Sequence, residues 1–250
     1  MRIAAIRRFP SLFASALGFL SILPAPAQAR FEPAGMVACF PVAGLFLGLL
    51  AACLDRAACV WWSPQAAGVL DAVFLAVVSG GLHLDGLADA ADGLMGHHGK
   101  DRALSIMKDS RVGAMGLLAV VLCLAVKTAG LAHLGPHRFL AVMLVPAYAR
   151  ALMLFGLLGL PYGRENGTGR AFFEKPLSVS VFAGLIPAAL LSLFLGGRFF
   201  VLNLAFLLAG PALVLFYKKR LGVITGDMLG AMTEVGEALF FLAISARWPL

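Results

Sequence analysis

Charged residues are scarce in this sequence: aspartate, glutamate, lysine and arginine together make up 13% of its 250 residues. Soluble domains carry about 25% charged residues, so this composition argues against an ordinary soluble globular protein. Cysteine is scarce too, and the four cysteines show no CxxC spacing and lie in or beside apolar runs. That pattern argues against disulfides and thiolate metal sites, and it favours small packing residues in a membrane.

Hydrophobic residues, by contrast, make up 61% of the chain, and several apolar runs approach the roughly 20 residues that span a bilayer. We therefore expect an all-α integral membrane protein that forms one polytopic domain over residues 1–250, with the lipid bilayer as its surroundings. About six or seven transmembrane helices are expected. The candidate spans are 34–54, 65–82, 113–134, 139–160, 177–195, 199–217 and 229–246.

The N-terminal segment 1–33 imitates a secretory signal, with arginines before an apolar run. Prolines at 10, 24 and 26 bracket that run, which argues against cleavage. At about 15 residues the run is short for a span, so we expect a helix that lies in the membrane interface.

Basic residues are distributed unevenly between the two sides of this expected topology. Segment 1–33 and the polar stretches 80–113, 161–176 and 217–230 fall on one side and hold fourteen of the twenty lysines and arginines, against four on the other side. The positive-inside rule places the first side in the cytoplasm. In a membrane protein, an excess of basic residues reflects which loops face the cytoplasm. The net charge of +7 is therefore no sign of nucleic-acid binding, and we expect no nucleic-acid partner.

The acidic stretch 80–113 is the most unusual part of the chain. Asp85, Asp89 and Asp92 recur at i, i+4 and i+7, so on a helix they lie within about 60° of arc. At about 6 Å and an effective dielectric near 20, each pair of ionised carboxylates repels by roughly 3 kcal/mol. Either some are protonated or a hard divalent cation lies among them, and Mg²⁺ is the first expectation. The alternative is a solvated polar loop.

Other polar groups follow in the same stretch. Lys108, Asp109, Ser110 and Arg111 offer cationic and hydroxyl groups that suit phosphate oxygens. His83 precedes the first aspartate by two positions, so we expect it to act as a base or to support the acids.

Two further loops carry glycine-flanked polar residues. Arg164 and Arg170 lie among glycines, which suits a phosphate-binding loop, although a glycine-rich turn with positive-inside arginines explains them equally well. Thr225 and Asp227 precede the last apolar run. Asp227 is either a fourth carboxylate at the metal site or a helix cap.

Inside the expected spans, the charged residues Lys127, Arg150, Glu234 and Glu237 are costly. An unpaired ionised side chain at mid-bilayer costs roughly 3 kcal/mol or more. We therefore expect cations and acids on different helices to pair, either for structure alone or around a polar interior.

Four motifs make the chain similar to a known family. The motifs are 80–93 (GGLHLDGLADAADG), 106–113 (IMKDSRVG), the loop 164–172 and 225–231 (TGDMLGA), with Lys127 between them. In this order they resemble cobalamin synthase, the adenosylcobinamide-GDP ribazoletransferase family. The chain departs from the family at FLSI over 19–22, where the family usually has FLTR, at 222–223 and at 228.

The resemblance implies a Mg²⁺-dependent phosphotransfer in the bacterial inner membrane, with the active-site loops in the cytoplasm. The 5′-hydroxyl of α-ribazole, or of its 5′-phosphate, would attack the cobinamide-side phosphorus of adenosylcobinamide-GDP and release GMP. Homo-oligomerisation stays open. From the residues and the resemblance together we expect catalytic roles for His83, Lys108 and Arg111, metal binding by Asp85, Asp89, Asp92 and Asp227, and substrate binding by Asp109, Ser110, Lys127, Arg150, Arg164, Arg170 and Thr225.

Two other interpretations are considered. A CDP-alcohol phosphotransferase would share the start of the acidic motif at 89–93, but Gly96-His97 stand where Ala-Arg is expected and the downstream aspartate pair is missing. A divalent-cation transporter would use the aspartates as a permeation site. In this sequence the acids follow a span, whereas transporter sites usually lie at mid-membrane.

Overall fold

A computed structural model describes residues 2–24, 26, 31–96, 98–167 and 169–246 of the chain. Helices make up nearly all of this part, which contains no named strand and one isolated bridge between Tyr162 and Ile224. The elements are α1 (Arg2–Leu20), α2 (Pro33–Met36), η1 (Val37–Cys39), α3 (Phe40–Trp61), α4 (Pro64–Val78), α5 (Leu82–Met95), α6 (Lys100–Ile106), α7 (Ala114–Ala132), η2 (Gly135–His137), α8 (Arg138–Gly159), η3 (Arg170–Phe173), η4 (Val179–Leu185), α9 (Ile186–Ser192), η5 (Leu193–Leu195), α10 (Arg198–Arg220) and α11 (Gly226–Ser245).

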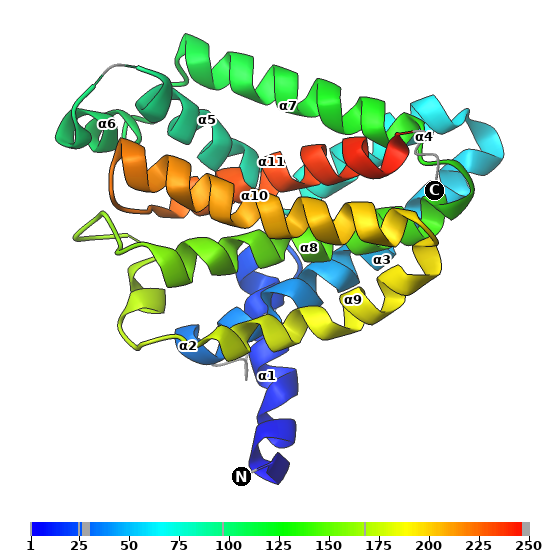
Figure 1. Cartoon of the computed structure of the whole chain (residues 1–250), viewed down its shortest axis with the longest axis horizontal. Coiled ribbons are helices and arrows are strands. Elements are labelled where there is room, and N and C mark those ends of the chain that lie inside the picture. The colour runs from blue at the N-terminus through cyan, green and yellow to red at the C-terminus, as the bar shows by residue number, and fades with distance from the viewer. Residues whose placement is uncertain (1, 25, 27–30, 97, 168, 247–250) are drawn as a thin grey trace.

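The long helices lie side by side along the longest axis of the molecule, as Figure 1 shows for α3, α7, α8, α10 and α11. Within the described part, five helical segments are long and apolar enough to cross a membrane: Pro33–Trp61, Ala114–Ala132, Gly135–Gly159, Arg198–Arg220 and Gly226–Ser245. α8 and α11 are the most buried of them and form the centre of the bundle. The prediction of an all-α multi-pass membrane protein is confirmed.

The second expected span is bent. α4 ends at Val78, and α5 leaves it at an angle of 87°. Gly80 and Gly81 make this turn with φ of 62° and 73°, a left-handed conformation that residues with a Cβ rarely adopt. The acidic stretch is therefore not a loop, because most of it forms α5 and α6. Counting α4 and α5 as one bent span gives six spans in the described chain.

The expected span 177–195 is also shorter than predicted. Val179–Leu195 is a 17-residue run of 3₁₀ and α-helix, and it falls short of the length of the other spans. Gly184 packs so closely on the backbone of Ala38 that a Cβ would lie 1.8 Å from that carbonyl oxygen. Pro187 begins the α-helical part, where a missing N–H is tolerated. By length and composition, the described part of the chain therefore has five or six spans instead of six or seven. The run 179–195 nevertheless extends along the long helices from one end of the bundle to the other (Figure 1), so the C-terminal ends of α8 and α10 stay on the same side.

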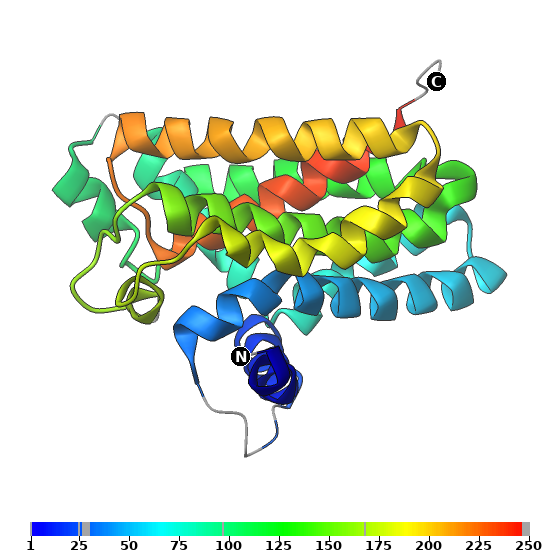
Figure 2. The same cartoon turned by 60° about the horizontal axis from the view of Figure 1, so that its bottom comes forward.

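The N-terminal helix α1 runs across the long helices instead of alongside them (Figures 1 and 2). It packs against α3 and is not among the segments suited to crossing a membrane. Its predicted interfacial position fits this orientation and stays a prediction.

The three polar regions meet at one end of the bundle. Figure 1 shows α6, the segment after α8 and the turn between α10 and α11 at the same end. Hydrogen bonds join them: Arg220 donates to the carbonyl oxygen of Gly96 at 2.7 Å, and the Gly163 amide donates to Ile224 at 2.8 Å. Segments far apart in sequence therefore form one polar surface.

Candidate active site at one end of the bundle

The acidic helix α5 packs directly on the start of α11. A Cβ on Gly86 would lie 2.8 Å from the carbonyl oxygen of Asp227, so only glycine allows the two backbones to approach this closely. The contact brings the α5 acids to Asp227. Asp89 interacts electrostatically with Asp85, Asp92 and Asp227, and with Arg164 as the opposing positive charge.

Arg164 joins the three polar regions at this point. The bridge between Tyr162 and Ile224 holds its loop against the α10–α11 turn. Its guanidinium donates from Nη2 to the carbonyl oxygen of Met107 at 3.0 Å and forms an ion pair with Asp227. Both side chains are mostly buried, at 13% and 19% exposed. The predicted arginine and the predicted fourth carboxylate therefore lie in one cluster.

The cap of α11 is Thr225. Its Oγ1 accepts a hydrogen bond from the Met228 amide at 3.3 Å, the usual geometry of an N-cap. The interpretation of Asp227 as the helix cap is wrong, because the carboxylate of Asp227 is paired with Arg164 instead. The same hydroxyl donates to Oδ2 of Asp227 at 3.5 Å, and the substrate-binding role of Thr225 stays a prediction.

Asp92, the third acid of the α5 face, makes a different set of contacts. Its two carboxylate oxygens accept hydrogen bonds from the Gly113 amide at 2.7 Å and the Gly116 amide at 2.8 Å. These amides belong to the first turn of α7, which has no cap from its own side chains. A negative charge at a helix N-terminus is favourable. Asp92 thus anchors α7 to α5.

The donor chemistry of the cluster fits a hard divalent cation. In the described part of the chain, no group of three or more His, Cys, Asp or Glu side chains is already arranged as a metal cage. Mg²⁺ does not require one, since it usually keeps several waters and binds through one or two carboxylates together with substrate phosphates. Asp85, Asp89 and Asp227 supply such oxygens on two adjoining helices. Metal binding stays a prediction.

A cavity of about 280 Å³ adjoins the acid cluster, and Asp85, Asp227 and His83 line it. His83 is buried, with 2% of its surface exposed, and neither ring nitrogen has a hydrogen-bond partner among the described residues. His83 therefore shares a cavity with Asp85 and Asp227, and its role as a base or as a support for the acids stays a prediction.

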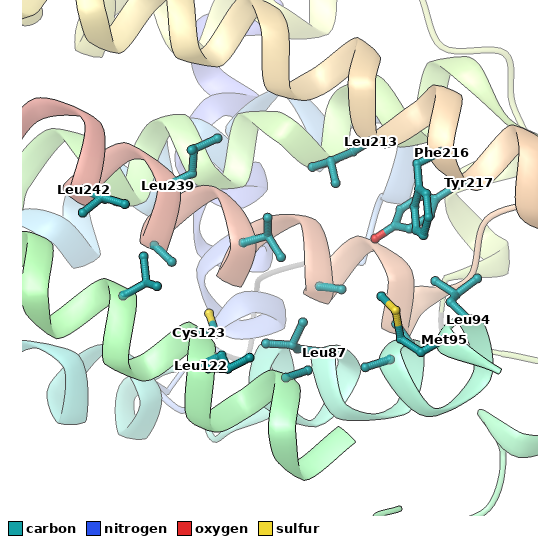
Figure 3. A pocket seen from close by; sticks show the side chains of 17 residues that line it. Leu87, Leu94, Met95, Leu122, Cys123, Leu213, Phe216, Tyr217, Leu239 and Leu242 are labelled. Carbon is teal, nitrogen blue, oxygen red and sulfur yellow. The ribbon is translucent and has the colours of Figure 1, made fainter. Parts of the chain in front are cut away.

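A larger cavity of about 410 Å³ lies between α5, α7, α10 and α11 (Figure 3). Leu87, Leu122, Leu213 and Leu239 are typical of its lining, which includes no charged side chain. Phosphoryl transfer needs cationic groups or metal ions to neutralise phosphate oxygens, so this cavity is not a candidate for the chemistry.

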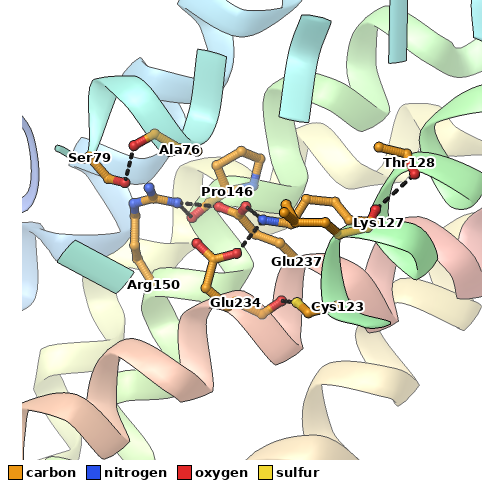
Figure 4. Close-up of polar contacts among 10 residues, drawn as sticks. Ala76, Ser79, Cys123, Lys127, Thr128, Pro146, Arg150, Glu234 and Glu237 are labelled. Atoms are coloured by element: carbon orange, nitrogen blue, oxygen red, sulfur yellow. Dashed lines mark hydrogen bonds and ion pairs between the residues drawn. The ribbon is translucent and has the colours of Figure 1, made fainter. Parts of the chain in front are cut away.

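One buried network joins the charged residues Lys127, Arg150, Glu234 and Glu237 (Figure 4). Lys127 donates to Glu234 at 2.5 Å and to Glu237 at 2.8 Å, while Arg150 donates to Glu237 at 2.7 Å. All four side chains are at most 3% exposed. The predicted pairing across helices is confirmed. The substrate-binding roles of Lys127 and Arg150 stay predictions, and in the structure both bind glutamates.

The chain was compared with known proteins. A family model described as cobalamin-5-phosphate synthase matches residues 12–245. The chain belongs to this family. Relatives named adenosylcobinamide-GDP ribazoletransferase include one from Roseiflexus sp., 37% identical over 94% of this chain and 89% of the relative, and one from Syntrophobacter fumaroxidans, 37% identical over 95% and 99%. A third, from Klebsiella pneumoniae, is 34% identical over 93% and 98%. No solved structure matches the chain.

In this member of the family, the residues after α6 lie at the edge of the site. Lys108, Ser110 and Arg111 are exposed, and no described contact joins them to the acid cluster. Arg111 pairs with Asp109 at 2.6 Å, and its hydrogen bonds lower the pKa of Asp109 to about 2. Arg170 is exposed too, and it lines a separate cavity of about 420 Å³ together with Arg164.

The structure brings together two groups of residues that the sequence patterns did not predict. Phe19, Phe40 and Phe172 line the cavity beside His83, and no spacing in the sequence connects them. At the opposite end of the bundle, Arg138 pairs with Asp55 at 2.6 Å and with Asp71 at 3.1 Å. The only signal for this second group was that its two acids fall in apolar surroundings, where a buried charge needs a partner.

Proposed function

We propose that the chain transfers the cobinamide phosphate group of adenosylcobinamide-GDP to a ribose hydroxyl of α-ribazole, or of its 5′-phosphate, and releases GMP. The expected 5′-hydroxyl is not kept as the nucleophile, because the 5′-phosphate has no free hydroxyl at that position. The product is adenosylcobalamin or its phosphate. The observation that carries this proposal is the convergence of the family's acidic motif on α5 with Asp227 and Arg164 in one cluster. Membership of a family whose relatives carry the ribazoletransferase name supports it.

The cationic groups have a defined task in this reaction. Negative charge spreads over the phosphate oxygens during transfer, and preorganised cations stabilise it. Arg164 is mostly buried and touches both Asp227 and the backbone of Met107, so its guanidinium is held at the place where a diphosphate would enter. Lys108 and Arg111 are exposed at the same end and would reach the outer phosphate or the released GMP.

The carboxylates would hold Mg²⁺, with Asp85, Asp89 and Asp227 as its ligands. When bound, the ion supplies charge neutralisation and orientation of the phosphate oxygens. Asp85 also lines the cavity beside the cluster. This position suits it to accept the proton of the attacking hydroxyl, and Asp92 keeps α7 in register through its two amide contacts.

The described chain is multi-pass, and we place it in the bacterial inner membrane with this end in the cytoplasm. Most lysines and arginines belong to segments of this side, as the positive-inside rule requires. A cytoplasmic site also gives the nucleotide-linked substrate direct access.

The test is a turnover assay with purified protein in detergent, adenosylcobinamide-GDP, α-ribazole and Mg²⁺, scored for GMP. We expect Asp89→Asn to lower turnover by orders of magnitude and to leave the melting temperature unchanged. Asp101→Asn, on the exposed first turn of α6, is the matched control and should stay active. A chelator should abolish activity, and added Mg²⁺ should restore it.

Full activity of Asp89→Asn and of the matching Asp85→Asn would contradict the proposed site. CMP release from a CDP-linked substrate and an alcohol acceptor, without GMP release, would favour a CDP-alcohol phosphotransferase. Cation flux into proteoliposomes without release of either nucleotide would favour a transporter.

A further inference from the structure

The cavity beside the acid cluster combines two surfaces of different chemistry. It lies where α1, α3, α5, α11 and η3 meet. Three phenyl rings form an aromatic surface, and an imidazole and two carboxylates form a polar one. These lining residues are Phe19, Phe40, Phe172, His83, Asp85 and Asp227.

The aromatic surface is built from three separate segments. Phe19 lies at the end of α1, Phe40 begins α3, and Phe172 belongs to η3. The centroid of the Phe172 ring lies 5.1 Å from the centroid of the Phe19 ring and 5.6 Å from that of the Phe40 ring. The centroids of the Phe19 and Phe40 rings are 6.1 Å apart. Aromatic rings pack favourably on other aromatic rings in stacked and edge-to-face arrangements. A cavity with three rings in its lining therefore suits a flat aromatic group.

His83 supplies a hydrogen-bonding group to the same cavity. It is 2% exposed, and neither of its nitrogens has a partner among the described residues. A buried polar group without a hydrogen bond is destabilising. A ligand that offers one hydrogen-bonding atom inside an otherwise apolar ring system would satisfy it.

The size and polarity of the cavity distinguish between the substrates of the proposed reaction. Its volume of about 280 Å³ is at the lower end of pockets that enclose a whole drug-sized ligand, so a corrin macrocycle does not fit. Guanine carries several donors and acceptors on its edge, and the phenyl rings would leave most of them unpaired. The dimethylbenzimidazole base of α-ribazole has two methyl groups and one free ring nitrogen, which matches three phenyl rings and one imidazole.

We propose that this cavity is the subsite for the aromatic base of the nucleoside acceptor, with Phe19, Phe40 and Phe172 against the ring system and His83 bonded to its free nitrogen. This assignment rests on the proposed function. The ribose then extends toward Asp85 and Asp227, whose carboxylates accept hydrogen bonds from hydroxyl groups. This places a ribose hydroxyl of the acceptor next to the acid cluster.

The subsite changes the role expected of His83. A general base acts on the chemical step and its loss lowers kcat, whereas a residue that binds the acceptor changes KM for that substrate alone. In this arrangement His83 binds the base of the acceptor, and Asp85 is the carboxylate next to the attacking ribose hydroxyl.

The first test compares two phenylalanines in similar aromatic clusters. Phe172→Leu removes a ring from the cavity, and Phe182→Leu removes a ring that packs on Phe155 at 4.9 Å and does not line the cavity. We expect Phe172→Leu to raise KM for α-ribazole by about tenfold and to leave KM for adenosylcobinamide-GDP unchanged. The control should change neither. Equal behaviour of the two variants, or an effect on KM for adenosylcobinamide-GDP instead, would overturn the subsite.

The second test uses His83 and does not depend on how a phenylalanine variant folds. His83→Leu should raise KM for α-ribazole with kcat nearly unchanged, and His83→Gln should restore part of the affinity. In wild-type protein labelled with ¹⁵N-histidine, α-ribazole should shift the His83 ring signals and GMP should not. A loss of kcat at constant KM, or no shift with α-ribazole, would refute this assignment. Absence of GMP release with any acceptor would instead refute the proposed function.

Discussion

Asp92 lies on the same face of α5 as the proposed metal ligands Asp85 and Asp89. Replacing it tests whether its carboxylate stabilises the fold or binds the metal. Its oxygens accept the Gly113 amide at 2.7 Å and the Gly116 amide at 2.8 Å, and α7 has no cap of its own. Hydrogen bonds to a charged group contribute roughly 1.5–3 kcal/mol each, and loss of a helix cap costs about 1 kcal/mol. The helix-cap value is a lower limit for the loss of stability, and the sum of the two hydrogen bonds is an upper limit. We expect Asp92→Ala to lower the free energy of unfolding by about 2–3 kcal/mol.

The assay measures the melting temperature and the Mg²⁺ titration of turnover on one preparation. Asp92→Ala and Asp92→Asn should both lower the melting temperature, because an amide offers only one acceptor to two backbone N–H groups. The Mg²⁺ concentration for half-maximal activity should stay at the wild-type value. Asp89→Asn is the comparison, with the opposite pattern expected. Normal stability of Asp92→Asn together with a raised Mg²⁺ requirement would refute the anchoring role and return Asp92 to the metal ligands.

Three further outcomes are expected. Lys127→Met should lower the free energy of unfolding by about 3–5 kcal/mol, because it removes the ion-pair partner of the buried Glu234 and one of the two partners of Glu237; a melting temperature equal to wild type would contradict this. The pKa of Asp109 is about 2 beside Arg111, so this small contribution to stability is present above the ordinary aspartate pKa and is lost as pH falls through 2. In Arg111→Ala an NMR titration should find the pKa of Asp109 higher, and an unchanged value would refute the pairing. In a cysteine-free background, a cysteine at Gly99 should react with impermeant reagents only from the cytoplasm and one at Gly197 only from outside; the reverse would overturn the topology.

Several parts of the fold and the site could be predicted from local sequence. The long apolar runs predicted most of the spans, since a helix that crosses a bilayer must be apolar over about 20 residues. The spacing of Asp85, Asp89 and Asp92 predicted one helical face, and α5 has that face. The need to pair buried charges predicted the network of Lys127 and Glu237. Each of these inferences depends on a rule that acts within one segment or on one kind of residue.

Other features required the packed chain. The role of Asp92 depends on which backbone amides lie within reach, and the two amides that it binds lie 21 and 24 residues further along the chain. The close packing of Gly184 on the backbone of Ala38 joins segments about 150 residues apart, which local sequence does not specify.

The sequence by itself determined the class of the protein, its family and the chemistry of its acidic helix, because hydropathy and charge act along the chain. Only the tertiary structure decided which groups meet. The turn at Gly80 and the close approach at Gly86 bring α5 to Asp227, and the bridge at Tyr162 brings Arg164 to the same carboxylate. The ring of Phe172 meets those of Phe19 and Phe40, which lie more than 130 residues earlier in the sequence. Contacts of this kind depend on how whole helices pack, and side-chain pattern within one segment does not specify them.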